Sequence, residues 1–156
     1  MNDEFEIKKE LIQELASLRE RISELEEELC ESEEKYRTVL ENIEDCYFEV
    51  DRAGDFTFFN PSLYRILGYT REEMSGMNYK VLMDAENANK VLKVFNEVYM
   101  TGIPTMCFDL ELIRKDGARM YIEMLISLIV RPGEKPTRFR GIGRDITERK
   151  RMEEKL

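Results

Sequence analysis

The first 43 residues carry apolar side chains at alternating spacings of four and three. No glycine or proline interrupts residues 4–43, so the segment favours one continuous helix. The 4-3 repeat gathers the apolar side chains into a narrow stripe, which is the pattern of a coiled coil. The seam that would face a partner helix consists of Leu11, Leu15, Leu18, Ile22, Leu25, Leu29 and Tyr36.

The charged residues beside this seam favour a parallel homodimer. In a parallel pair Glu14 would face Arg19 and Arg21 would face Glu26, which attract, while one further pair of glutamates would repel. Exposed pairs contribute only a few tenths of a kcal/mol each, so the leucine seam supplies the stability. The alternative is a lone amphipathic helix that folds back on its own domain.

Beyond this helix the pattern changes to short strands and short helices. Alternating apolar residues predict strands at residues 46–50, 56–59, 106–114, 119–131 and 137–144. Cap and stop signals predict helices at residues 61–67, 71–74 and about 85–100. This order, with hairpins at both ends, predicts an α+β fold: a five-stranded antiparallel sheet with short helices on one face. A pocket is expected between the two layers, and the arriving helix is expected to cover the other face.

The expected organisation has three parts. Residues 1–43 form the N-terminal helix or coiled coil, residues 44–147 the globular domain, and residues 148–156 the start of an exit helix. Thr147 is a good N-cap for that last helix. Residues 153–156 are similar to residues 26–29, so the chain is expected to be one unit of a larger receptor, although a stand-alone protein stays open.

Charge is concentrated in the N-terminal arm. Residues 1–45 hold 16 acidic and 6 basic side chains, whereas residues 46–156 hold 17 acidic and 18 basic ones. An acidic arm repels nucleic acid and anionic membranes, so neither is expected as a partner. The most apolar run, residues 124–130, is far shorter than the roughly 20 residues of a membrane helix.

The residues that most enzymes depend on are missing. The chain has no histidine, no phosphate-binding glycine loop and no metal-spaced cluster, so this segment is not expected to be an enzyme. Its three cysteines show no C-x-x-C spacing, which favours reduced thiols and a cytoplasmic location.

Six segments, taken together and in order, resemble the PAS family, in particular the PAS domains of bacterial or archaeal sensor kinases. The resemblance covers about residues 33–156, and its segments are residues 36–43, 50–54, 59–61, 67–74, 114–117 and 141–150. It implies a five-stranded PAS sheet, a pocket behind the sheet and signalling through the helices at both ends. It also implies that Asp145, Ile146 and Thr147 form the junction that transmits the signal, with Asp145 paired to a basic residue of the core.

The pocket is expected to bind a small apolar or amphipathic molecule, or simply to be filled by core side chains. Its candidate lining residues are Phe56, Phe58, Tyr79, Met83, Phe95 and Met124. Histidine-ligated haem is disfavoured because the chain has no histidine. Tyr79 stands where flavin-binding photosensors of the family carry a reactive cysteine, so flavin–thiol photochemistry is disfavoured too.

The leading functional prediction is a sensory module of a signal-transduction protein. It would dimerise through its helices and relay a stimulus or small ligand to an output domain, such as a histidine kinase of a two-component system. The alternative is a ligand-free structural spacer that only dimerises. The residues do not identify the stimulus, the ligand or the output domain.

Overall fold

The computed structural model describes residues 2–155, and the chain divides after Val39 into two compact units. Helix α1 (Asn2–Asn42) accounts for the first unit and is an uninterrupted helix of 41 residues. Its seven seam side chains are 46% to 60% exposed, and no residue between Asn2 and Val39 is buried. An apolar stripe without a packing partner adds little stability to a helix. The long helix is therefore consistent with the predicted coiled coil.

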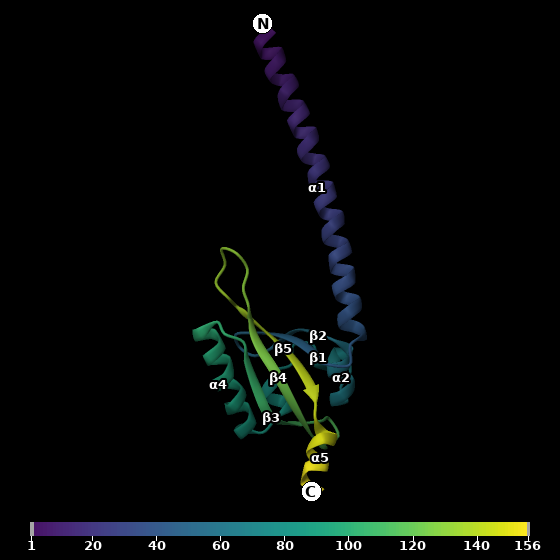
Figure 1. The fold of residues 1–156 in the computed structure, drawn as a ribbon, viewed down its shortest axis with the longest axis vertical. Coiled ribbons are helices and arrows are strands. Elements are labelled where there is room, and N and C mark those ends of the chain that lie inside the picture. Colours follow the sequence, from purple (N-terminus) through teal and green to yellow (C-terminus); the bar gives the residue numbers. More distant parts are fainter. Residues whose placement is uncertain (1, 156) are drawn as a thin grey trace. The chain divides into compact units, whose positions relative to one another are not determined.

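The second unit is built on a five-stranded antiparallel sheet (Figure 1). Its strands follow the spatial order β2-β1-β5-β4-β3. Their bounds are β1 (Cys46–Asp51), β2 (Phe56–Phe59), β3 (Thr105–Ile113), β4 (Arg119–Ile129) and β5 (Arg138–Asp145). Every strand end lies within two residues of its predicted position. The predicted α+β fold is confirmed.

Short helices cover one face of the sheet, and α4 runs beside β3 (Figure 1). Their bounds are α2 (Pro61–Leu67), α3 (Arg71–Met74), the 3₁₀ helix η1 (Tyr79–Leu82) and α4 (Ala85–Thr101), with the exit helix α5 (Thr147–Lys155) after the last strand. Asn60 caps α2 and Gly68 ends it in the left-handed conformation, as their sequence positions predict. The helix η1 was not predicted, because four residues are too few to show a helical period.

The hydrophobic core lies between the helices and the inner face of the sheet. Alternate residues of each strand point inward, as the period of two requires. β4, for example, buries Met120, Ile122, Met124 and Ile126. The helices contribute buried side chains from the opposite layer, among them Leu63, Leu67, Met74, Leu82, Val91, Phe95 and Val98.

Candidate functional site

A small apolar cavity, called the interior cavity below, lies within this core. Its volume is about 30 Å³, which is room for roughly one or two water molecules. In this conformation it is too small for a haem or a flavin, so any larger ligand has to displace a wall side chain. The wall consists of Phe48, Phe56, Leu63, Tyr79, Leu82, Met83, Val91, Phe95, Leu112, Ile122 and Met124.

Five of the six residues expected to line the pocket do line this cavity, and Phe58 does not. Phe58 is 39% exposed and packs edge-on against the ring of Tyr47, with the ring centroids 5.8 Å apart. The cause is a β-bulge in the β1–β2 pair, where Phe58 lies opposite Glu49 but Phe56 lies opposite Val50. The bulge breaks the simple alternation, so Phe56 faces the core and Phe58 faces outward.

The turn between β1 and β2 fixes the position of Tyr79. The Asp51 carboxylate accepts hydrogen bonds from the backbone N–H groups of Ala53 and Asp55, both at 3.0 Å. This turn brings Gly54 against the Tyr79 ring, and the Tyr79 N–H donates to the Gly54 carbonyl oxygen at 3.1 Å. A Cβ atom on Gly54 would lie 2.4 Å from Cε1 of that ring, so only glycine fits here.

The Tyr79 hydroxyl is a buried polar group without a hydrogen-bond partner among residues 2–155. The residue is 4% exposed, and its ring packs edge-on against Phe95 with the centroids 5.3 Å apart. Burial raises the pKa of the Tyr79 hydroxyl above its ordinary value, so it stays protonated at neutral pH. An unpaired buried hydroxyl is uncommon. It does not border the cavity, whose surface is entirely apolar.

The exit helix α5 is joined to the sheet next to this cavity. The Ile146 N–H donates to the Tyr121 carbonyl oxygen at 2.9 Å, and the Tyr121 N–H donates to the Thr147 Oγ1 at 3.0 Å. Ile146 itself is 4% exposed. Tyr121 belongs to β4 and is the direct neighbour of Ile122, a wall residue of the cavity. One strand therefore borders both the cavity and the junction.

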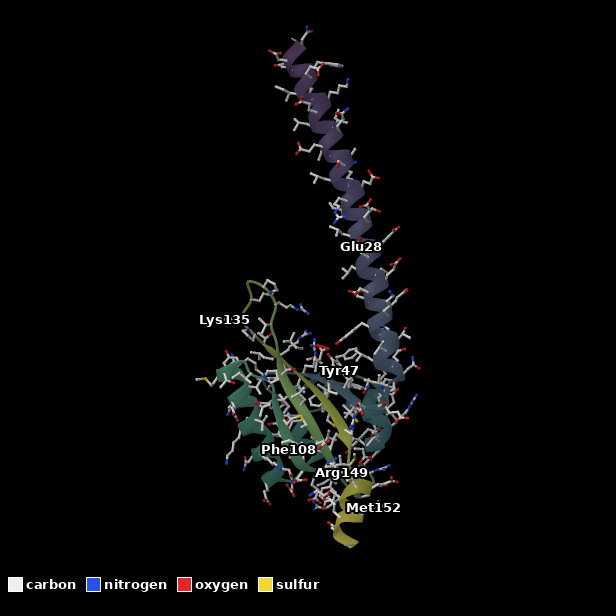
Figure 2. All side chains as sticks on the ribbon, viewed as in Figure 1. Glu28, Tyr47, Phe108, Lys135, Arg149 and Met152 are labelled. Carbon is white, nitrogen blue, oxygen red and sulfur yellow. The ribbon has the colours of Figure 1, made fainter. Side chains whose placement is uncertain are left out.

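Two ion pairs extend this attachment, and sequence reasoning missed both. Arg149 of α5, labelled in Figure 2, donates to Glu123 of β4 at 3.1 Å. Lys150 lies 2.8 Å from Asp109 of β3, a residue with a left-handed φ of 52° at a second bulge. The ion pair raises the pKa of Lys150 and lowers that of Asp109. No sequence signal marks Asp109, because its position depends on the bulge.

The hydrogen-bond partners of Asp145 and Thr147 differ from those expected. The Asp145 carboxylate accepts hydrogen bonds from the N–H of Thr147 at 2.9 Å and from its hydroxyl at 2.5 Å. α5 begins at Thr147, and the hydroxyl expected to cap this helix bonds to the Tyr121 backbone and to Asp145 instead. The basic groups that join α5 to the sheet belong to α5 itself, whereas Asp145 was expected to find a basic partner in the core.

The buried cysteines of the core are not reactive groups. Burial raises the pKa of the Cys46 thiol to about 12, and the negative charges of Asp145 and Asp45 add to the effect. Burial also raises the pKa of Cys107. Both thiols therefore stay protonated at neutral pH and act as small apolar packing groups.

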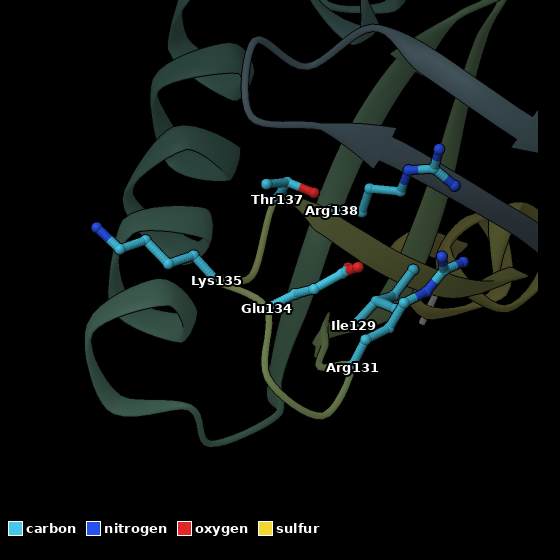
Figure 3. A pocket seen from close by; sticks show the side chains of 6 residues that line it. All are labelled: Ile129, Arg131, Glu134, Lys135, Thr137 and Arg138. Carbon is cyan, nitrogen blue, oxygen red and sulfur yellow. The ribbon is translucent and has the colours of Figure 1, made fainter.

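A second hollow, of about 190 Å³, lies at the β4–β5 hairpin (Figure 3). Figure 3 shows Lys135 pointing away from Arg131 and Arg138, while Glu134 points to the same side as the two arginines. The basic groups do not converge on one point, and an acidic side chain lies among them. The hollow is therefore a weak candidate for an anion site.

The outer face of the sheet carries a row of apolar side chains that crosses all five strands. Four of them are 38% to 42% exposed, and Phe108, labelled in Figure 2, adds a further exposed ring on β3. The strand registers and one ring contact place the row in the order Phe58, Tyr47, Ile142, Leu125 and Met106. Such a face favours a cover, and the predicted cover by the N-terminal helix stays a prediction.

A family model described as PAS fold matches residues 34–146. The chain belongs to the PAS family. Solved PAS structures agree: the PAS domain of an HTR-like protein from Haloarcula marismortui superposes with a TM-score of 0.63 and is 26% identical, over 80% of this chain and 99% of that one. The recognition made from the sequence is confirmed.

Two curated relatives place this PAS domain among signalling proteins. The probable diguanylate cyclase DgcE of Escherichia coli (strain K12) is 26% identical over 126 residues. The methyl sulfide methyltransferase-associated sensor of Methanosarcina acetivorans is 29% identical over 126 residues. The matches cover 81% and 80% of this chain but only 11% and 12% of those proteins. These relatives support a sensory signal-transduction module and do not favour a purely structural spacer.

The structure adds two negative findings for residues 2–155. None of the helices there combines the length and apolar character that a membrane span requires. The same residues contain no group of three or more histidine, cysteine, aspartate or glutamate side chains arranged to hold a metal ion.

Proposed function

We propose that this PAS domain senses a small molecule in the interior cavity, relays its presence through β4 to the exit helix α5, and works as a parallel homodimer. The observation that carries the proposal is the double role of β4. Ile122 and Met124 line the cavity, while the adjoining Tyr121 and Glu123 bind Thr147 and Arg149 of the exit segment.

This arrangement supports a short route from ligand to output. A molecule that enlarges the cavity presses on the inward side chains of β4. Because a close-packed strand transmits small displacements, the backbone groups of Tyr121 shift with them. Ile146 and Thr147 bond to that backbone, and Asp145 bonds to Thr147, so the start of α5 moves too. We therefore assign signal transmission to these three residues, with the Lys150–Asp109 ion pair steadying the first turn of the helix.

An output domain in the parent protein is the expected receiver of the signal. The relatives include a cyclase and a sensor, and a histidine kinase is the output that the sequence favours. On this proposal the chain itself performs no catalysis. Its role is to bind, to dimerise and to change the position of α5.

The dimer is carried by α1. The stripe that includes Leu18 and Leu25 is more than 45% exposed along a 41-residue helix, and a second copy of the same stripe would bury it. Burying one leucine is worth about 2 kcal/mol. A parallel pair places identical seam residues beside each other. One substitution in the seam therefore changes two buried side chains of the dimer.

The dimer is tested by Leu18→Glu, with Ser17→Glu as the matched control on the outward side of the same turn. We expect the wild-type chain and Ser17→Glu to be dimers at micromolar concentration by light scattering. Leu18→Glu removes two buried leucines, about 4 kcal/mol, so its dissociation constant should rise about 1,000-fold. Equal dimer fractions in all three proteins would show that α1 does not form the dimer interface.

A further inference from the structure

We propose that the interior cavity is the inner end of a two-part binding site for a small neutral amphipathic molecule, such as a short-chain alcohol, and that the Met83 side chain is the gate between the two parts. The outer part, called the η1–α4 hollow below, lies at the surface between η1 and the first turns of α4. Among residues 2–155, Met83 alone belongs to the linings of both spaces. This inference rests on the proposed function and specifies how its ligand enters and which groups the ligand carries.

Neither space is a complete ligand site by itself. The interior cavity has a volume of about 30 Å³ and the η1–α4 hollow one of about 270 Å³. Sites for small molecules typically enclose roughly 300–1,000 Å³. When the Met83 side chain turns away, the space that it leaves joins the cavity to the hollow, and the joined space comes within that range.

The backbone is held on both sides of Met83, so its side chain can move alone. The Met83 N–H ends η1 by donating to the Lys80 carbonyl oxygen at 3.4 Å. The next residue, Asp84, caps α4, and its carboxylate accepts from the N–H of Asn87 at 2.9 Å. Met83 is 8% exposed, so it closes the cavity in this conformation. An unbranched methionine changes rotamer more easily than a β-branched or aromatic side chain, which suits it to a gate.

The interior cavity selects the apolar end of the ligand. Its surface is entirely apolar, and none of its wall residues carries a charge. A hydroxyl, carboxylate or ammonium group placed there would lose its hydrogen bonds to water and gain none in return. A ligand with a polar end therefore has to leave that end on the outer side of Met83.

The η1–α4 hollow selects the polar end. Its polar side chains are Lys80, Asp84 and Asn89, and its other lining residues besides Met83 are Ala85, Ala88 and Leu92. Lys80 and Asn89 are exposed and offer N–H donors, and Asp84 offers a carboxylate. Because one basic and one acidic side chain line the hollow, a charged end of either sign would meet a like charge. A neutral hydroxyl both donates and accepts, so it fits this mixed lining.

The test follows the binding of 1-hexanol to the full chain by methyl NMR. The methyl signal of Met124 reports on the interior cavity, and those of Leu92 report on the hollow. Asn89→Trp places a large ring over the hollow, and Asn96→Trp is the matched control, at an exposed position two turns further along the same side of α4. Met83→Ala removes the gate. Cyclopentanone serves as a compact probe of the cavity, and hexanoate and hexylamine serve as charged probes.

We expect 1-hexanol to shift the Met124 and Leu92 signals together. Asn89→Trp should weaken its binding about 2- to 10-fold, because the polar end loses its partners, while Asn96→Trp should leave binding unchanged. Met83→Ala should raise the rate of entry about 10-fold, because binding no longer waits for a side chain to move. Hexanoate and hexylamine should each bind about 10-fold more weakly than 1-hexanol.

Four results would contradict the proposal, and the last would also overturn the proposed function. Equal binding of 1-hexanol to Asn89→Trp and Asn96→Trp would show that the ligand does not use the hollow. Shifted Leu92 signals with an unchanged Met124 signal would show that the hollow binds alone. A charged probe that binds as tightly as 1-hexanol would rule out selection of a neutral end. If neither 1-hexanol nor cyclopentanone shifts Met124 even in Met83→Ala, the cavity takes no ligand and the proposed sensing function fails as well.

Discussion

Replacing Asn60 with alanine is expected to lower the free energy of unfolding by about 3–5 kcal/mol. Asn60 is 1% exposed and uses both ends of its amide. Its Oδ1 accepts from the N–H of Tyr47 at 3.0 Å and of Leu63 at 3.3 Å. Its Nδ2 donates to the carbonyl oxygens of Leu40 at 3.0 Å and Asp45 at 2.9 Å.

The cost is high because alanine leaves several backbone groups unpaired in the interior. Each unsatisfied buried group costs about 1–3 kcal/mol, and the cap of α2 is lost as well. Urea unfolding followed by circular dichroism measures the effect. Thr70→Ala is the matched control, because Thr70 caps α3 in an exposed position and should cost only about 1 kcal/mol. Equal losses for the two variants would show that the buried bonds of Asn60 add nothing beyond a cap.

Gly141→Ala is expected to destabilise the domain by about 1–3 kcal/mol and to push the Phe48 ring into the interior cavity. Gly141 lies opposite Phe48 in the β1–β5 pair. A Cβ atom there would lie 2.2 Å from Cζ and 2.4 Å from Cε1 of that ring. Since these distances are far inside van der Waals contact, the ring has to move, and the cavity lies beside it.

Two further variants separate this clash from a general effect of adding a methyl group to β5. A Cβ atom on Gly143 would lie 2.6 Å from Cδ1 of Ile122, the flexible end of that side chain. Gly143→Ala should therefore lose less stability than Gly141→Ala. Phe48→Leu removes the ring, so the Gly141→Ala/Phe48→Leu double variant should lose less stability than the two single losses added together. Simple additivity of the two losses would contradict the clash as the cause.

The hydrophobic pattern predicted the elements well because each element shows its own period. The 4-3 spacing from Leu11 to Leu29 indicated α1, and alternation in the later segments indicated all five strands. Turn and cap residues located the element ends, as with Asn60 and Gly68 at the two ends of α2. These signals are local, so a single sequence contains them.

The details of the candidate site depended on features that are not local. A bulge of one residue turned Phe58 to the outer face while keeping Phe56 inside, and alternation alone does not reveal it. The Lys150–Asp109 pair needs the left-handed backbone of Asp109 at another bulge. Asn60 was recognised as a cap, but its bonds to Leu40 and Asp45 depend on how three chain segments meet.

The amide NMR spectrum of the full chain, recorded with and without cyclopentanone, shows whether a ligand in the interior cavity affects the exit helix. The methyl signals of Met83 and Met124 show in the same sample whether the cavity is occupied. We expect occupancy of the cavity to shift the amide signals of Tyr121, Ile146 and Lys150 together, because β4 carries the displacement to α5. Shifted methionine methyls with unchanged amide signals at the junction would contradict it, since the cavity would then bind a ligand without relaying anything to the exit helix.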